Sequence, residues 1–346
     1  MGMARVKQVS AVAWLIGISA FIGLIIWSSP SAVGQAVVTV GWGLPLLVVV
    51  RVVTVAAAGA GWWLLFPAKA RSRLRTCVLL RFIREAINVL LMQVGGDLIG
   101  ARLLTLRGVS GPLAAASVIV DVLIQAATQL LFAILGLIAL VALEADETLV
   151  RIATVGLTAA ALMLVGFYLA QRRGGQRILR WSIGRVRSTR KWRALGTTDA
   201  VYQNLAVIYS SPFRIFASSL THMTGWIVGV IEVLVVLSFM GHSIGIAEAL
   251  VIESLMQAIR GAAFVIPGAF GAQEGGLVLL CGEFGIAPEQ AIALSLAKRA
   301  ADLVLGVPSL LGWQVLEWQQ LKDKYTLTAR WGGSVNSRSH EPPKEA

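Results

Sequence analysis

Long apolar runs constrain this chain more than any other feature. They cover about 9–29, 37–66, 114–143, 151–171, 215–240 and 288–318. Runs of this length span the hydrocarbon core as helices, because a helix bonds every backbone polar group internally. Only 14% of the residues are charged, against about 25% in soluble domains. The sequence therefore predicts an all-α polytopic membrane protein with about six full spans.

The charges of the connecting segments orient these spans. Residues 67–84 are rich in Arg and Lys, and 172–193 hold nine basic residues and no acid, whereas 144–147 read EADE. Positively charged loops stay in the cytoplasm, so we expect the two basic segments inside and 30–36 and 144–150 outside. Both termini are then cytoplasmic. Topology also explains the formal charge of +12, so we expect no nucleic-acid partner.

Two further stretches, 77–107 and 244–284, are long enough to enter the membrane but are broken by glycines. The second break reads FVIPGAFGAQEGG at 264–276. The orientation of the flanking loops requires each stretch to enter and leave on one side. Re-entrant helical hairpins are the preferred interpretation, although two packed full spans at either place satisfy the same requirement.

Non-helical backbone in a membrane must be satisfied by protein or by water in a cavity. We therefore expect the breaks to come together around a polar pocket. A short helix should start near Gly276, and the free N–H groups of a helix start suit a phosphate or another anion.

A single shift along the chain aligns its two parts. The shift that places Asp97 on Glu274 also places 37–66 on 214–243 and 114–143 on 291–320. We call this shift the repeat offset. The single span between the parts gives them opposite orientations, which is an inverted-topology repeat of the kind that builds secondary transporters.

This repeat divides the chain into five parts. They are an N-terminal span and loop, a first repeat, a linking span with a basic cytoplasmic loop, a second repeat and a disordered cytoplasmic tail. Their bounds are 1–36, 37–143, 144–213, 214–320 and 321–346.

The sequences around the two breaks resemble a known family. IPGAFGAQEGG with GIAPEQAIALSLAKRAADLVLG, and RFIREAINVLLMQVGGDLIGARLL with DVLIQ, are similar to the flippase-like transmembrane domain of bacterial lysylphosphatidylglycerol synthases. The resemblance covers about 9–320 and is closest to stand-alone members associated with hopanoid biosynthesis. It implies a bacterial inner-membrane protein with two inverted halves that moves a lipid headgroup between leaflets. The synthases' soluble lysine-transferring domain has no counterpart here, so lipid aminoacylation is not implied.

Charged residues at the breaks and on the last run are the candidate substrate-binding residues. Glu274 would bind a cationic headgroup, a proton or a basic partner, or else cap the helix that follows the break. Lys298 and Asp302 lie four residues apart, so an ion pair between them is geometrically easy. The remaining candidates, for binding or steering a headgroup, are Asp97, Arg299, Arg84, Arg102, Asp121 and Arg260.

Two other charges, Arg51 and Glu232, lie within runs and have no motif around them. We interpret them as buried pairing partners rather than as a ligand site. We expect no cofactor and no metal.

These observations predict a lipid translocase, not an enzyme, that moves or binds a polar-headed or anionic membrane lipid in hopanoid or phospholipid metabolism. The alternative is a non-transporting scaffold that recruits lipid-biosynthesis enzymes through 172–193. An intramembrane serine protease is a third hypothesis, since GVSG contains Ser110 and a later run contains His222. The aligned GIAP has no Ser, which favours a turn signal instead.

Overall fold

The computed structural model describes residues 31, 35, 38–70, 72–90, 95–173, 197–263, 266 and 269–335. Throughout these residues the regular structure is helical and no strand occurs. The predicted run 9–29 and most of the basic segment 172–193 lie outside the described residues, so the structure does not test them.

Pairs of short helices alternate with long ones. The first part of the chain forms α3 (Gly43–Leu64), η1 (Ala68–Ala70), α4 (Leu74–Leu90), α5 (Gly95–Thr105) and α6 (Gly111–Ala142). Next come α7 (Glu147–Arg173) and α9 (Thr198–Tyr209). The last part forms α10 (Pro212–Phe239), α11 (Ile246–Ala262), α12 (Ala272–Glu283) and α13 (Pro288–Val335).

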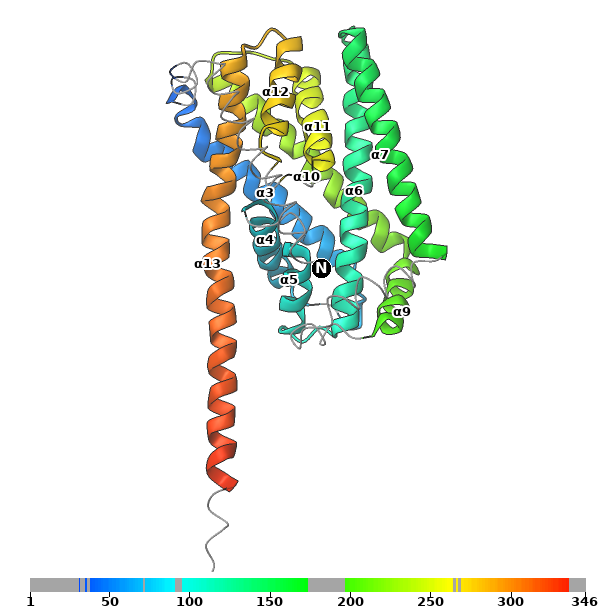
Figure 1. Cartoon of the computed structure of the whole chain (residues 1–346), viewed down its shortest axis with the longest axis vertical. Coiled ribbons are helices and arrows are strands. Elements are labelled where there is room, and N and C mark those ends of the chain that lie inside the picture. The colour runs from blue at the N-terminus through cyan, green and yellow to red at the C-terminus, as the bar shows by residue number, and fades with distance from the viewer. Residues whose placement is uncertain are drawn as a thin grey trace, which may run out of the picture.

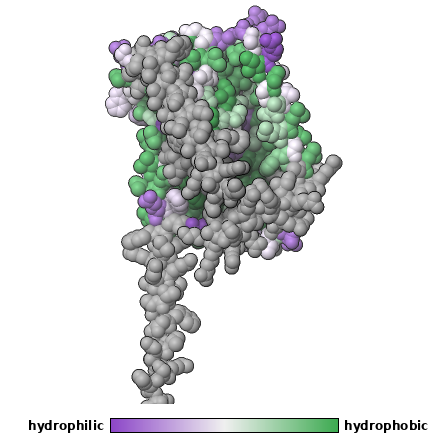
Figure 2. Space-filling model, in the orientation of Figure 1, coloured by the Kyte–Doolittle hydropathy of each residue, from purple (hydrophilic) through white to green (hydrophobic). Residues whose placement is uncertain are grey.

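Four described helices are long and apolar enough to cross a membrane: Gly43–Leu64, Gly111–Ala142, Glu147–Leu169 and Pro212–Phe239. They confirm the predicted runs 37–66, 114–143, 151–171 and 215–240 as helices. The predicted run 288–318 lies within α13, which is not among the four because its first third carries Lys298, Arg299 and Asp302. The described surface in view is hydrophobic over its middle and hydrophilic toward both ends (Figure 2).

The short helices at the two breaks form packed pairs. α4 packs on α5, and α11 packs on α12. α4 and α11 have 17 residues each, which at about 1.5 Å per residue gives about 25 Å, less than the ~30 Å of a hydrocarbon core. In Figure 1 the α4–α5 pair lies near the end where α6 begins, and the α11–α12 pair lies near the end where α13 begins.

The turn that follows each short pair has the same backbone geometry at positions related by the repeat offset. Gly108 and Gly285 have positive φ values of 87° and 71°. Val109 N–H donates to Leu104 O, and Ile286 N–H donates to Cys281 O, which is the helix-ending bond of a Schellman motif. The starts of α5 and α12, at Gly95 and Ala272, are related by the same offset, as are the starts of α6 and α13.

Helices of the two parts pack against one another. α3 runs along α10, α6 along α11 and α4 along α13. Small residues allow these close approaches: a Cβ added at Gly136 of α6 would overlap Ser254 Oγ of α11. The two parts therefore pack directly against each other, and their buried apolar residues form two hydrophobic cores.

Two details differ from the sequence-based prediction. α12 begins at Ala272 rather than near Gly276, because Gly271, with φ of 78°, turns the backbone directly before it. The segment 321–335, expected to be part of a disordered tail, continues α13 as helix; it contains no Pro and no Gly before Gly332. Residues 336–346 lie outside the described residues.

Candidate functional site

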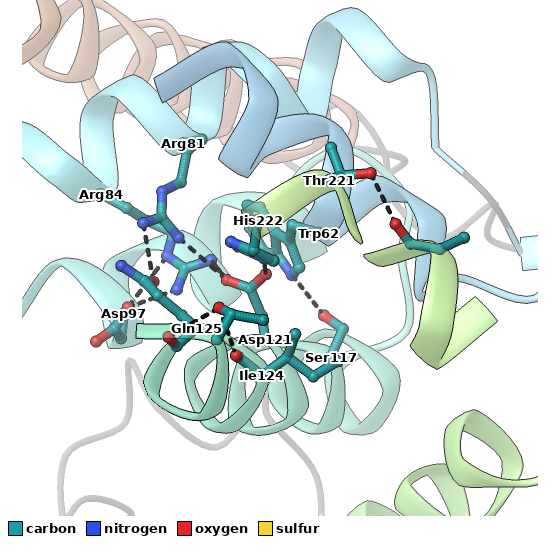
Figure 3. Close-up of polar contacts among 12 residues, drawn as sticks. Trp62, Arg81, Arg84, Asp97, Ser117, Asp121, Ile124, Gln125, Thr221 and His222 are labelled. Atoms are coloured by element: carbon teal, nitrogen blue, oxygen red, sulfur yellow. Dashed lines mark hydrogen bonds and ion pairs between the residues drawn. The ribbon is translucent and has the colours of Figure 1, made fainter. Parts of the chain in front are cut away.

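Asp121 is the centre of a buried polar cluster in the first part of the molecule (Figure 3). Its side chain, on α6, is fully buried. Oδ2 accepts from Arg84 Nη1 at 2.8 Å and from Arg81 Nη1 at 3.2 Å. Oδ1 lies 3.1 Å from His222 Nε2 of α10. We call Arg81, Arg84, Asp97, Asp121 and His222 the Asp121 cluster.

Arg84 connects this cluster to the first break. Its Nη2 donates to Asp97 Oδ1 at 2.6 Å and its Nε to the same oxygen at 3.1 Å. The guanidinium carbon lies 4.5 Å from the ring centroid of Trp62, within the range of a cation–π contact. Asp97 is the third residue of α5, so its charge also lies where the helix dipole favours an anion.

Arg81 connects the cluster to a more exposed carboxylate. Its Nη2 donates to Gln125 Oε1 at 2.9 Å and to Glu85 Oε2 at 3.3 Å. The Glu85 side chain is 35% exposed, whereas that of Arg81 is 5% exposed. A chain of charged contacts thus runs from the buried Asp121 to the periphery of α4.

Lys298 is the centre of a second buried cluster, formed by α3, α10, α11 and α13. Its Nζ lies 2.5 Å from Glu253 Oε2 and 3.0 Å from Glu232 Oε2. Glu232 also contacts Arg51 Nη2 at 2.9 Å, so the two residues expected to have buried pairing partners are partners of each other. Neither oxygen of Glu232 accepts an aligned hydrogen bond from the described residues, so its contacts are electrostatic. We call Arg51, Glu232, Glu253, Lys298 and Asp302 the Lys298 cluster.

Asp302 contacts two guanidinium groups. Arg51 Nε lies 3.6 Å from Oδ1 and Arg260 Nη2 lies 3.8 Å from Oδ2. The ion pair between Lys298 and Asp302 that their spacing allows is not among the contacts of the described residues, in which each has other partners. Their spacing along α13 permits it, but α10 and α11 supply closer carboxylates to Lys298.

Glu274 has the capping role that was the structural alternative for it. The fully buried carboxylate accepts from Gly271 N–H at 2.7 Å, at the start of α12. It also accepts from Ser295 Oγ at 2.6 Å and from Arg299 Nε at 2.9 Å. The Arg299 guanidinium carbon lies 4.0 Å from the Phe270 ring centroid. The N–H groups at the start of α12 were expected to bind a ligand anion. In part they are instead hydrogen-bonded to a carboxylate of the chain itself.

The candidate residues do not converge on one pocket. Asp97, Arg84 and Asp121 lie in the Asp121 cluster, while Lys298 and Asp302 lie in the Lys298 cluster, with Arg260 at its edge. Glu274 and Arg299 form a third group near the start of α12, and Arg102 lies in the last turn of α5.

A cleft between α3, α4 and α13 brings the two clusters close to each other. Its charged lining residues are Arg51 and Asp302, from the Lys298 cluster, and Glu85, which contacts Arg81. The other lining residues are small or apolar: Val55, Phe82, Ala86, Val89, Leu305 and Gly306. The cleft therefore places charges of both signs beside an apolar wall.

Several polar residues of the clusters were not among the sequence-based candidates: Arg81, Glu85, Glu253, Gln257, Ser295 and, as a partner of Asp121, His222. Glu253, Gln257 and His222 lie on apolar helices outside any motif, whereas Arg81, Glu85 and Ser295 lie within the family-like motifs but were not singled out there. One signal was available, since an ionisable residue inside a membrane helix is by default a candidate for function or pairing. His222 had been considered only as a partner of Ser110, which lies at the start of α6, three turns before Asp121.

Comparison with known proteins identifies a family. The model of the lysylphosphatidylglycerol synthase TM region matches residues 14–312. No curated protein and no solved structure matches the chain. The matched range contains both clusters, the cleft and both breaks.

Proposed function

Because the chain belongs to the lysylphosphatidylglycerol synthase TM-region family, which indicates a membrane lipid-related role, we propose that it is a lipid translocase. In this proposal it moves a polar-headed lipid between the leaflets of a bacterial inner membrane and catalyses no covalent reaction. The family's stand-alone members linked to hopanoid metabolism are the type that we propose for it.

The cleft between α3, α4 and α13 is the observation that carries this proposal. Arg51, Glu85 and Asp302 offer charges of both signs, and Phe82, Val89 and Leu305 offer an apolar wall beside them. A lipid has the same division into a charged headgroup and acyl chains. Ionisable residues within membrane helices mark substrate paths in many transporters.

The arrangement of the short helix pairs supports a transport mechanism. In Figure 1 they lie toward opposite ends, and α6 and α13 run in opposite directions. We propose that the parts are inverted repeats and the short pairs re-entrant hairpins. Movement of one part against the other would then open the cleft toward each leaflet in turn.

Reconstitution in liposomes tests the proposal. Fluorescent phosphatidylglycerol is placed in both leaflets, and dithionite then quenches the outer leaflet. A translocase makes nearly all of the probe accessible over time, whereas empty liposomes keep the inner half protected. If no polar-headed lipid moves faster than in empty liposomes, the proposal is wrong and the scaffold alternative gains support.

Matched variants connect the activity to the cleft. Val89→Trp fills the cleft from α4 and should slow lipid movement strongly. Leu79→Trp adds the same indole to α4 at a side chain that is 65% exposed and does not line the cleft, so it should transport like the wild type. Equal rates for the two variants would place the lipid path elsewhere.

A further inference from the structure

The three helices around the cleft have counterparts in the other part of the chain. The repeat offset places α3 on α10, α4 on α11 and α6 on the first part of α13. α3, α4 and α13 all pack against one another, and so do α10, α11 and α6. A corner between α6, α10 and α11 is therefore related to the cleft by the repeat offset. We call it the second corner.

A glutamine fills the second corner at the position where the cleft has a glycine. The repeat offset places Gln129 on Gly306, which lines the cleft. The Gln129 side chain reaches from α6 to α11, where its Nε2 donates to Gln257 O at 2.5 Å. A Cβ added at Gly261 would lie 2.9 Å from the same nitrogen, so the amide lies directly against the backbone of α11. Gly306 has no side chain that could close the cleft in this way.

Aromatic side chains add to the filling of the second corner. Trp226 Nε1 of α10 donates to Thr128 Oγ1 at 3.2 Å. The Trp226 ring also stacks on Phe132, with ring centroids 6.2 Å apart. The repeat offset places Val49 on Trp226 and Phe132 on Ser309, so both counterparts in the other part are smaller. The difference between the open cleft and the filled corner is thus built from side-chain size at related positions.

Gln129 is connected to the buried Lys298 cluster. Gln257, whose carbonyl oxygen binds Gln129, donates from its own Nε2 to Glu253 Oε1 at 2.8 Å. Glu253 shares Lys298 with Glu232. The Gln129 amide therefore lies between the outer side of α11, where Gly261 is exposed, and a buried group of charges.

One carboxylate of that cluster has hydrogen-bonding capacity left. Glu232 takes the position of Val55, a lining residue of the cleft, under the repeat offset. Its side chain is 1% exposed, and its Oε2 contacts Arg51 and Lys298. Its Oε1 has no hydrogen-bond partner in the part of the chain that the structure describes. Because two cations already compensate the charge, the group that Oε1 lacks is a neutral donor such as a hydroxyl.

We propose that the second corner is a second headgroup site, closed in this structure by Gln129, for a headgroup that carries a hydroxyl. When the amide of Gln129 leaves Gln257 O, a headgroup takes its place between α6, α10 and α11 and donates to Glu232. The cleft and the second corner then receive the headgroup in turn. This order of events rests on the proposed translocase function, but the existence of the second site does not.

Thiol labelling tests whether Gln129 closes the corner. Thr128→Cys places a thiol in the second corner, and Leu305→Cys places one at the related position in the cleft. A small charged methanethiosulfonate should modify Leu305→Cys quickly and Thr128→Cys slowly. Adding Gln129→Ala should speed the modification of Thr128→Cys by about tenfold, the factor expected for the loss of one hydrogen bond. Equal rates with and without the glutamine overturn the proposal.

Two controls accompany the labelling. Cys77 and Cys281 are fully buried, so they should remain unmodified in every variant that is folded. Gly306→Gln is the reciprocal change and should slow the modification of Leu305→Cys, because it places the same amide in the cleft. A Leu305→Cys thiol that reacts equally fast in Gly306→Gln contradicts the size argument.

Short-chain lipids test the chemistry of the headgroup. In Thr128→Cys/Gln129→Ala, dihexanoyl phosphatidylglycerol should protect the thiol from the reagent. Dihexanoyl phosphatidylmethanol has the same charge but no hydroxyl, so it should protect less. Equal protection by both lipids would exclude the hydroxyl as the recognised group, and protection by neither would show that the corner is no headgroup site.

A reversible cross-link tests whether lipid movement uses the second site. In Gln129→Cys/Gly261→Cys a short bifunctional methanethiosulfonate should join α6 to α11, stop the movement of fluorescent phosphatidylglycerol in liposomes, and release it again on reduction. Thr154→Cys/Thr158→Cys, on the exposed face of α7, is the matched control and should transport equally with and without the cross-link.

The experiments separate this proposal from the translocase function. If the wild type moves no lipid but Gln129→Ala uncovers a thiol that phosphatidylglycerol protects, the translocase function is wrong and the second site stands. If the cross-linked protein moves lipid at an unchanged rate, the translocase function stands and the second corner is not on the lipid path.

Discussion

Lys298 of α13 lies between two carboxylates, with its Nζ 2.5 Å from Glu253 Oε2 and 3.0 Å from Glu232 Oε2. All three side chains are at least nine-tenths buried. Since they come from α13, α11 and α10, one ammonium group joins three helices. Removing one partner of such an arrangement leaves charge buried without compensation, which is the costly case for buried ion pairs.

Replacing Lys298 should therefore destabilise the protein strongly. We expect Lys298→Met to lower the free energy of unfolding by about 3–5 kcal/mol, measured by titration with a denaturing detergent. The double variant Lys298→Met/Glu253→Gln should recover part of the loss, because one uncompensated charge is then removed. Arg151→Met, at an exposed position of α7, is the control and should change little. A Lys298→Met protein as stable as this control would contradict the prediction.

Close packing of α6 on α11 gives a second prediction. A Cβ added at Gly136 would overlap Ser254 Oγ and lie 2.9 Å from Ser254 Cβ. Gly136→Ala should cost about 1–3 kcal/mol, the usual range for overpacking, and Ser254→Gly in the same chain should relieve it. Gly156→Ala, on α7 with no described atom within 4 Å of the added Cβ, should not destabilise, because Ala favours a helix interior more than Gly does. The thermal unfolding midpoint in detergent measures all three variants, and equal midpoints would refute the close contact.

Asp97 and Glu274 should differ in their importance for stability although each is the third residue of its helix. Glu274 is fully buried and accepts from Gly271, Ser295 and Arg299. The side chain of Asp97 is 19% exposed. If Asp97 is replaced, its partner Arg84 still has the ion pair with Asp121. Glu274→Gln should cost about 1.5–3 kcal/mol, as for hydrogen bonds to charged groups. Asp97→Asn should cost less in the same unfolding assay, and the opposite order would contradict this reasoning.

Labelling of single cysteines tests the expected orientation. Cys77 and Cys281 are fully buried, so a membrane-impermeant maleimide should not react with the folded wild type. Thr148→Cys, beside EADE, should react from outside intact cells. Ser210→Cys, directly after α9, should react only once the membrane is opened; α9 lies toward the end of the molecule opposite to the start of α7 (Figure 1). The reversed pattern would show that the charge rule misassigned the two sides.

Much of the helix framework was predictable, because it depends on run length and glycine position. The repeat offset found in the sequence reappears in the starts of α5 and α12 and in the turns at Gly108 and Gly285. These turns need a positive φ, which glycine adopts without steric cost. The extent of α13 was not predictable in this way, since no local signal ends it near 320.

The partners of the charged residues were less predictable, because tertiary packing decides them. That Arg51 and Glu232 would each need a partner followed from the cost of leaving either charge alone in hydrocarbon, but the identity of the partner did not. The pairing of Lys298 with Asp302 was equally reasonable at i,i+4 spacing. It failed because α11 lies against α12 and α10, and so brings Glu253 to Lys298. Nothing in the sequence near His222 indicates that Asp121, far earlier in the chain, is its partner.

α3 and α10 each contribute a side chain to the cluster in the other part of the chain. Arg51 of α3 contacts Glu232, and His222 of α10 contacts Asp121. During synthesis, a nascent polypeptide that ends at 143 holds Arg51 and Asp121 before Glu232 and His222 exist. Asp121 already has Arg81 and Arg84 at that stage, but Arg51 gains the Glu232 carboxylate only when α10 arrives beside α3. We expect the isolated N-terminal fragment to be degraded rapidly in a pulse-chase experiment and to be rescued by co-expression of residues 197–346.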